Sequence, residues 1–207
     1  MVNSRGAERK RRSDRKRDIR PTVKYELREC VYRIAYITDT PIKDVAEAIV
    51  INGITSPKVV SYIAQQFQRD MRVDNTLYRK NENAVPVQTR ALGGKTGRIT
   101  IRFKTEAYEV IRAMSYALDC SVSRACAVIL DASVRDGDFI DDFVRSYMER
   151  NIDAERMKDL RKVLRYVNAN NPYQEEYTWA SLLSLMVEEV REVAEGATDF
   201  LIRNWRD

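Results

Sequence analysis

The chain has 207 residues, of which 44% are apolar and 32% charged, and its formal net charge is +5. This length and composition suffice for a hydrophobic core and exclude a wholly disordered chain. The sequence contains no histidine, which excludes Ser-His-Asp and Cys-His nucleophile activation as well as histidine metal sites. Its three cysteines, Cys30, Cys120 and Cys126, form no CxxC pair. We therefore expect a reduced intracellular protein with no metal and no cofactor.

The apolar residues are spread along the chain in short runs. None approaches the roughly 20 consecutive apolar residues that span a bilayer. The basic opening of the chain is also not followed by the apolar segment of a signal peptide. We expect no membrane partner.

The charge is strongly segregated along the chain. Residues 1–20 carry nine Lys or Arg and three acidic residues, a net of +6, and residues 79–104 carry seven and one, again +6. Residues 21–78 are balanced at seven and seven, whereas residues 105–207 carry thirteen and twenty, a net of −7. Concentrated Lys and Arg are typical of nucleic-acid binders, although short basic stretches are also common in solvated tails and linkers.

Residues 1–20 are predicted to be a basic disordered arm, because no apolar period runs through them. We expect this arm to contact phosphates. The residues expected to make these contacts are Arg9, Lys10, Arg11, Arg12, Arg15, Lys16 and Arg17.

Residues 21–78 are predicted to form an N-terminal helical domain. The alternation at 22–27 indicates a short strand, and helical spacing follows it. Thr40-Pro41 resembles an N-cap followed by a proline at the first helical position, and a third helix is predicted over 56–71. Residues 79–97 lack a sustained period and contain Gly93-Gly94, which favours a basic linker.

The pattern changes sharply at residue 98. Residues 98–103 alternate perfectly, with Ile99, Ile101 and Phe103 on one face and polar residues on the other, as in a half-buried strand. A helix is predicted from about Glu106, and a second one, capped by Ser121, runs to about residue 134 and closes near Gly137.

A strand, a helix of about a dozen residues and a capped second helix, in this order, resemble the ribbon-helix-helix family of the Arc/MetJ type over residues 98–136. One strand and two helices cannot bury their apolar faces alone, so two copies must pair, with their strands forming an antiparallel ribbon. The resemblance implies a mainly α fold with ribbon-helix-helix units, double-stranded DNA as partner, and a homodimer or an intramolecular pseudo-dimer.

A two-stranded ribbon fits the major groove, where Arg donates to guanine and Thr contacts several base edges. We expect Arg98, Thr100 and Arg102 to read bases. The start of the second helix offers backbone N–H groups to a phosphate, and lysines flank the strand. The expected phosphate contacts are Lys95, Lys104, Ser121, Val122 and Ser123. The alternative is a plain solvent face on an edge strand, with Ser121 serving only as a cap.

The N-terminal half shows the same strand-helix-helix order less clearly. Aligning Val23, Tyr25 and Leu27 with the apolar residues of the 98–103 strand predicts a degenerate second copy at 20–55, with a first helix about five residues shorter. The outer face of its strand then carries Thr22 and Lys24, together with Glu26, and such a pseudo-dimer suits a non-palindromic site. A helix-turn-helix made of 28–38, 41–51 and 56–71 is the competing interpretation.

Residues 98–137 thus form the predicted DNA-binding unit, and residues 138–207 an acidic helical region. Helices are predicted over 139–148 and 153–167. A longer helix from about Thr178 carries an apolar seam of period near 3.5, which suits core packing or self-association, including higher-order assembly.

The function expected from these features is that of a transcriptional repressor or regulator that binds double-stranded DNA in a sequence-specific way, located in the cytoplasm with the nucleoid of a prokaryotic or viral-host cell. An architectural or accessory role in plasmid or phage replication, segregation or DNA processing is the alternative. We expect no enzyme, and so no catalytic residue, because the sequence lacks a phosphate-binding glycine loop. Its adjacent carboxylate pairs, Asp141-Asp142 and Glu188-Glu189, point to different helix faces and make poor metal sites. An RNA-binding role remains open.

Overall fold

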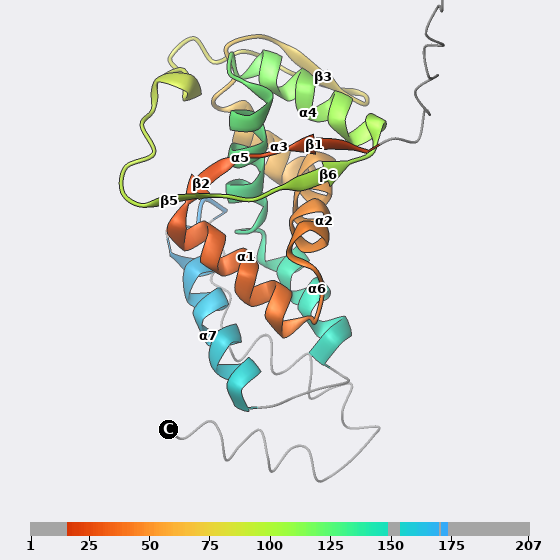
Figure 1. Cartoon of the computed structure of the whole chain (residues 1–207). Coiled ribbons are helices and arrows are strands. Elements are labelled where there is room, and N and C mark those ends of the chain that lie inside the picture. Colours follow the sequence, from red (N-terminus) through yellow and green to blue (C-terminus); the bar gives the residue numbers. More distant parts are fainter. Residues whose placement is uncertain (1–15, 149–153, 170, 174–207) are drawn as a thin grey trace, which may run out of the picture.

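The computed structural model describes residues 16–148, 154–169 and 171–173. Seven α-helices, six strands and one 3₁₀ turn form within these residues (Figure 1). In chain order they are β1 (Arg17–Ile19), β2 (Thr22–Lys24), α1 (Tyr25–Ile37), α2 (Ile42–Thr55), α3 (Pro57–Ala64), β3 (Met71–Val73), β4 (Thr76–Tyr78), η1 (Val87–Thr89), β5 (Thr96–Arg98), β6 (Ile101–Phe103), α4 (Thr105–Ala117), α5 (Val122–Ser133), α6 (Gly137–Met148) and α7 (Ala154–Asn168).

Strands that are far apart in the sequence form one antiparallel ribbon. β1 pairs with β6, and β2 pairs with β5. The two numbers in every pair add up to 120, from Arg17 opposite Phe103 to Lys24 opposite Thr96. The Ile99 N–H also donates to the Pro21 carbonyl, at 3.3 Å, between the two paired stretches. Residues 17–24 and 96–103 therefore share a single register, and the ribbon forms within one chain.

The two helical hairpins that follow the strands repeat each other at a spacing of 80 residues. α1 spans 25–37 and α4 spans 105–117, and α2 and α5 begin at 42 and 122. The turns between the helices match as well, because Asp39 and Asp119 both adopt a positive φ, of 47° and 50°. Such a left-handed residue commonly ends a helix. The chain thus contains two strand-helix-helix units.

The predicted alignment of these two units was wrong by four residues. Ile19, Pro21 and Val23 occupy the positions of Ile99, Ile101 and Phe103, and the two first helices both have 13 residues. The strand predicted at 22–27 ends at Lys24, and Glu26 lies on α1. The misreading arose because the spacing of Val23 and Leu27 fits both a strand and the first turn of a helix.

Other predicted boundaries also move. β1 lies inside the segment expected to be a disordered arm, and β5 begins inside the predicted linker 79–97. The helix predicted over 56–71 ends at Ala64, and a short β3–β4 hairpin follows, with Asp74 at a positive φ of 51°. α2 is separated from α3 by Ser56 alone, which leaves no room for the three- to four-residue turn of a helix-turn-helix.

The paired units share one core. In Figure 1 the ribbon passes between α1 and α4, with α2 and α5 behind it. The inner face of the ribbon and all four of these helices contribute buried apolar side chains to one cluster. The largest fully buried members of that cluster are Phe67, Phe103, Ile34, Ile37, Ile49, Ile63, Ile101, Ile111, Met114, Leu118, Ile129 and Leu130.

The C-terminal helices belong to the same core. α6 and α7 lie close to the predicted helices 139–148 and 153–167. α7 packs on α1, and it buries Leu160, Val163, Leu164 and Val167 almost completely. The helix predicted from Thr178 lies outside the described residues.

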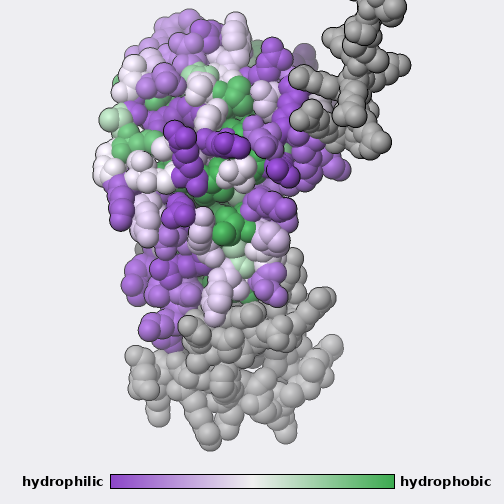
Figure 2. Space-filling model, viewed as in Figure 1, coloured by the Kyte–Doolittle hydropathy of each residue, from purple (hydrophilic) through white to green (hydrophobic). Residues whose placement is uncertain are grey.

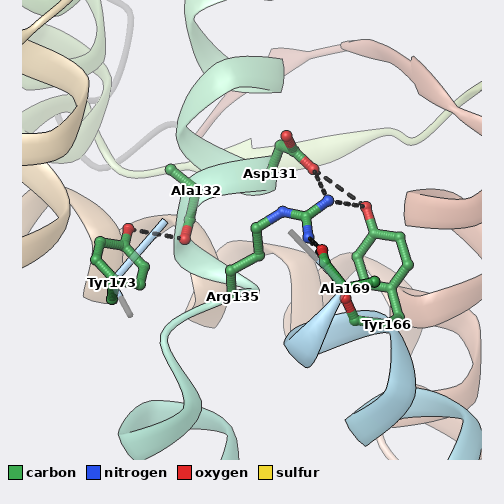
Figure 3. Close-up of polar contacts among 6 residues, drawn as sticks. All are labelled: Asp131, Ala132, Arg135, Tyr166, Ala169 and Tyr173. Carbon is green, nitrogen blue, oxygen red and sulfur yellow. Dashed lines mark hydrogen bonds and ion pairs between the residues drawn. The ribbon is translucent and has the colours of Figure 1, made fainter. Parts of the chain in front are cut away.

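Polar contacts fasten α7 to the end of α5 (Figure 3). The Arg135 guanidinium donates to the carbonyls of Tyr166 and Ala169 at the end of α7, and it pairs with Asp131 at 3.4 Å. The Tyr166 hydroxyl donates to Asp131 at 3.1 Å. Burial, together with the Asp131 charge, raises the pKa of Tyr166 above its usual value. Cations near the last carbonyls of a helix stabilise it, so Arg135 helps to hold α7 in place.

A second polar contact joins α7 to α1. Arg33 donates to Asp159 at 2.5 Å, and Lys162 donates to the same oxygen at 2.9 Å. Burial acts to raise the pKa of Asp159, but the hydrogen bonds and charges of Lys162 and Arg33 outweigh it and lower that pKa.

No single helix among the described residues is long and apolar enough to cross a membrane; one pair, α4 with α5, passes such a test jointly by length and composition but bends by 98°.

Candidate nucleic-acid interface

The ribbon presents two faces of opposite character. Ile99, Ile101 and Phe103 point inward and are at most 3% exposed. The three residues predicted to read bases, Arg98, Thr100 and Arg102, are all exposed on the other face. The predicted inside-outside alternation is therefore confirmed for this strand.

The first strand completes the outer face. Thr22 lies opposite Arg98, Asp18 opposite Arg102 and Lys24 opposite Thr96, and continuing the same register places Arg20 opposite Thr100. Asp18, Arg20 and Lys24 are exposed, and Thr22 is partly so. Sequence reasoning found Thr22 and Lys24 but missed Asp18 and Arg20, because it assigned them to the arm.

This outer face is strongly basic. Residues 16–24 and 95–104 together contain eight Lys or Arg and a single acidic residue, Asp18. Figure 2, which has the same view as Figure 1 with the ribbon in front of the helices, shows hydrophilic side chains across the ribbon. Nearby cations that face one way attract a polyanion at long range, and this attraction weakens as salt is added.

Two of the basic residues form ion pairs with acidic residues of the helices. Lys16 pairs with Glu47 of α2 at 2.7 Å, and Arg17 pairs with Glu109 of α4 at 3.2 Å. Arg17 also lies over the Tyr108 ring, 4.5 Å from its centroid. Their role at the ends of the ribbon is thus partly structural, unlike the phosphate contact predicted from their place in the arm. Arg9, Lys10, Arg11, Arg12 and Arg15 lie outside the described residues.

The lysines that flank the second strand differ in their surroundings. Lys95 places its Nζ 4.9 Å from the centroid of the Tyr25 ring, and its carbonyl accepts from the Tyr25 N–H at 2.9 Å. Lys104 is exposed at the residue before α4. Both cations thus lie where the ribbon meets the first turn of a helix.

The start of α5 is tied to the ribbon. Ser121 caps the helix by accepting from the Arg124 N–H at 3.2 Å, as predicted. The Ser123 hydroxyl donates to the Arg20 carbonyl at 2.8 Å and thereby joins the first turn of α5 to the middle of the ribbon. The Ser121 N–H already donates to Gln88 at 3.4 Å. The predicted phosphate site is therefore reduced to the N–H groups of Val122 and Ser123, which lack partners within a helix.

An equivalent helix start was missed by sequence reasoning. By the 80-residue repeat, Ile42 and Lys43 at the start of α2 correspond to Val122 and Ser123 of α5. Lys43 is exposed and adds a cation to the positive end of this helix. The predicted Thr40 cap does not form, because the Thr40 hydroxyl donates to the Thr38 carbonyl at 3.0 Å and Pro41 directly precedes the helix. The repeat itself was the signal that identifies this second site.

The segment that connects the two units is held against α5. Arg124 donates to the carbonyls of Val87 and Arg90, at 3.3 and 2.7 Å, and Val87 is buried. A cavity of about 280 Å³ remains under this segment. Its lining includes Val23, Lys24, Leu27, Tyr62, Arg90 and Arg124.

The three cysteine thiols are poor nucleophiles near neutral pH. Burial raises the pKa of Cys30 and of Cys126 to about 12, and it raises that of the half-buried Cys120 to about 11. All three thiols therefore stay protonated near neutral pH, where the thiolate would be the nucleophile. The described residues contain no cluster of three or more possible metal ligands.

Comparisons of the chain with protein-family models, with curated proteins and with solved structures found no match.

Proposed function

We propose that this chain is a sequence-specific double-stranded DNA-binding protein of the ribbon-helix-helix type, which inserts its β-ribbon into the major groove and regulates transcription by occupying an operator. The observation that carries the proposal is the ribbon of residues 17–24 and 96–103, whose inner face is buried and whose outer face is exposed and basic. The major groove of B-DNA accepts a two-stranded ribbon, and it displays a distinct pattern of donors and acceptors for each base pair.

The chemistry of the outer face suits base recognition. Arg98 and Arg102 can each donate two hydrogen bonds to a guanine, and Thr100 can bond a polar base edge or contact a thymine methyl group. A merely solubilising face would need charge, but it would not need side chains that can hydrogen-bond to bases at every second residue of the second strand.

The two helix starts provide the means of holding the ribbon in register with the duplex. The N–H groups at the start of α5 lie beside the centre of the ribbon, through the bond between Ser123 and Arg20, and the repeat gives α2 the equivalent position. Backbone N–H groups at helix starts bind phosphates and orient a protein on DNA without reading its sequence. Lys43, Lys95 and Lys104 add positive charge around the same face.

One chain supplies the whole reading element, since both strands and both helical hairpins come from it. The chain is therefore expected to bind a site as a monomer, which separates it from regulators in which the ribbon forms only on dimerisation. Occupying an operator requires contact alone and no catalytic group.

The experiment is in vitro selection of binding sites from a random duplex pool, followed by affinity measurement on the selected site. Arg98→Ala or Arg102→Ala should each weaken binding to that site by about 5- to 150-fold, the cost of one good bidentate contact, and should change binding to random duplex much less. Arg165→Ala, an exposed change on α7, serves as the matched control and should leave both affinities unchanged.

Two outcomes contradict the proposal. Equal affinity for duplex DNA and duplex RNA of the same sequence argues against major-groove reading, because side chains cannot enter the narrow major groove of RNA. Uniform weakening of both specific and random binding by the Arg98 and Arg102 variants shows that these side chains contact phosphates and not bases.

A further inference from the structure

The two halves of the ribbon are related by a pseudo-twofold axis. The ribbon register pairs each residue with the one whose number completes 120, and the repeat relates residues 80 apart. Arg20 and Thr100 satisfy both relations at once, so the axis passes between these two residues.

Next to this axis, on either side, the outer face carries one outward-facing cross-strand pair. Thr22 lies opposite Arg98 on one side, and Asp18 lies opposite Arg102 on the other. The axis exchanges these two pairs, so that Asp18 takes the place of Arg98, and Arg102 the place of Thr22. In a ribbon with exact twofold symmetry the exchanged residues are identical. Here they differ in both cases, Asp18 from Arg98 and Thr22 from Arg102.

The arginines are nonetheless distributed evenly. Arg98 and Arg102 both belong to the second strand, two residues before and two residues after Thr100, so the outward pair next to the axis holds one arginine in each half. Along a strand this spacing amounts to ~14 Å, or about four base-pair steps of a duplex. Each half of a bound site is then expected to hold one guanine, read from non-equivalent positions.

Asp18 gives one half a recognition chemistry that the other lacks. Its carboxylate lies 3.1 Å from the Nε of Arg102, and both side chains are substantially exposed. A carboxylate in the major groove accepts from the amino group of cytosine, and it repels phosphate. It also holds the Arg102 guanidinium beside it, which limits where that arginine can donate.

From this arrangement we infer that the DNA target is not an inverted repeat: Thr22 and Arg98 read one half, and Asp18 and Arg102 read a different half that holds a guanine next to a cytosine. This inference rests on the proposed function, since it concerns the bases that the same ribbon recognises.

The first test is the sequence selected by the full-length protein from a random duplex pool. The expected result is a single motif without inverted-repeat symmetry, with one chain bound per site. An enriched inverted repeat overturns the inference and leaves the proposed function standing. Binding without enrichment of any motif overturns the proposed function as well.

The second test makes the ribbon symmetric. The triple variant Asp18→Arg, Arg20→Thr, Thr22→Arg gives the first strand the same outward residues as Arg98, Thr100 and Arg102. It is expected to select an inverted repeat. Asp18→Arg alone raises the charge by the same amount and is expected to keep an asymmetric motif. A triple variant that still selects the original motif contradicts the inference.

The third test changes one half only. Asn donates to and accepts from adenine, so Asp18→Asn is expected to shift the preference from cytosine to adenine at one position, by about 5- to 150-fold in relative affinity. The half read by Arg98 should keep its preference. A shift in both halves, or in neither, contradicts the assignment. A thermal melt of each variant verifies folding, which the exposure of Asp18 favours.

Discussion

Gly53 and Ser133 contact each other where α2 and α5 cross, and there is no space between them for a further carbon atom. A Cβ placed on Gly53 would lie 1.7 Å from the Ser133 Oγ and 2.9 Å from the Ser133 Cβ. The two residues are 80 apart, so they occupy equivalent positions in the two units. The Ser133 hydroxyl donates to the Ile129 carbonyl at 2.6 Å. α2 and α5 can therefore approach each other this closely only because Gly53 has no side chain.

Gly53→Ala is accordingly expected to destabilise the fold by about 1–3 kcal/mol, because the added methyl group overpacks the crossing. This cost outweighs the gain of roughly 1 kcal/mol that alanine usually brings inside a helix. Urea unfolding of both proteins measures the difference. Adding Ser133→Gly should recover part of the lost stability by removing the clashing side chain; absence of any recovery would locate the strain elsewhere.

The equivalent turns between the helices lead to a second prediction. Asp39 has a φ of 47° and is exposed. Asp39→Gly should be neutral or slightly stabilising, since glycine adopts this conformation without strain. Asp39→Val should cost about 1–2 kcal/mol, the penalty for a left-handed conformation in an L-residue. Thermal or urea unfolding checks the order, and equal stability of the two variants would argue against a left-handed turn.

The buried thiols predict a loss of stability in alkali. The pKa of Cys126 is about 12 in the folded chain against an ordinary value of 9.0, because burial disfavours the thiolate. The stability that the buried, protonated Cys126 contributes is fully present below pH 9. It is lost as the pH rises toward 12, because in this range the Cys126 thiol ionises in the unfolded chain before it does so in the folded chain. The slope is about 1.4 kcal/mol per pH unit for one group.

Cys126→Ala should flatten this pH dependence. The unfolding free energy of both proteins, measured between about pH 7.5 and 10.5, provides the comparison. Cys30, which is also buried with a pKa of about 12, and the tyrosines still contribute in the variant, so part of the slope remains. An identical slope in the two proteins would show that Cys126 is already ionised or exposed.

The C-terminal helices are expected to be required for stability. Leu160 is fully buried where α7 packs on α1, and Leu160→Ala should cost about 2–5 kcal/mol. Lys158→Ala, an exposed change on the same helix, should stay within about 0.5 kcal/mol of the original. Removing residues 138–207 exposes the same face of α1 and should yield an aggregating chain. A stable, monomeric truncation would mean that the ribbon and its four helices fold independently.

The basic N-terminal residues predict a change in salt dependence. Residues 1–15 contain six Lys or Arg and two acidic residues, and deleting them leaves β1 intact. If they neutralise phosphates, the dependence of log affinity on log salt becomes shallower by about 0.9 for each phosphate that is no longer neutralised. A titration of duplex binding against potassium chloride measures this slope. An unchanged slope would show that these residues do not contact the duplex.

Several elements were predictable because their patterns are local. The alternation of residues 98–103 and the capped helix at Ser121 each depend on neighbours a few residues apart, and both form as predicted. The first strand was placed wrongly because the basic residues before Ile19 indicated a disordered arm and because Pro21 is atypical inside a strand. Only its partner across the ribbon, with Ile19 opposite Ile101, establishes where it begins. The base-reading candidates of the second strand were predictable, whereas Asp18, Arg20 and Lys43 were not.

The sequence by itself determined which residues are apolar and at what local spacing, and hence the strand-helix-helix unit at 98–136 with its basic outer face. It left the N-terminal half open between a second such unit and a helix-turn-helix. Tertiary structure alone decided that these units pair with each other within one chain, in a register that joins Asp18 to Arg102. Periodicity reflects residues close in the chain, whereas the register depends on contacts between residues 72 to 86 positions apart, from Lys24 with Thr96 to Arg17 with Phe103, which no local pattern encodes. The same long-range contacts brought α7 onto α1 and made the C-terminal helices part of the core.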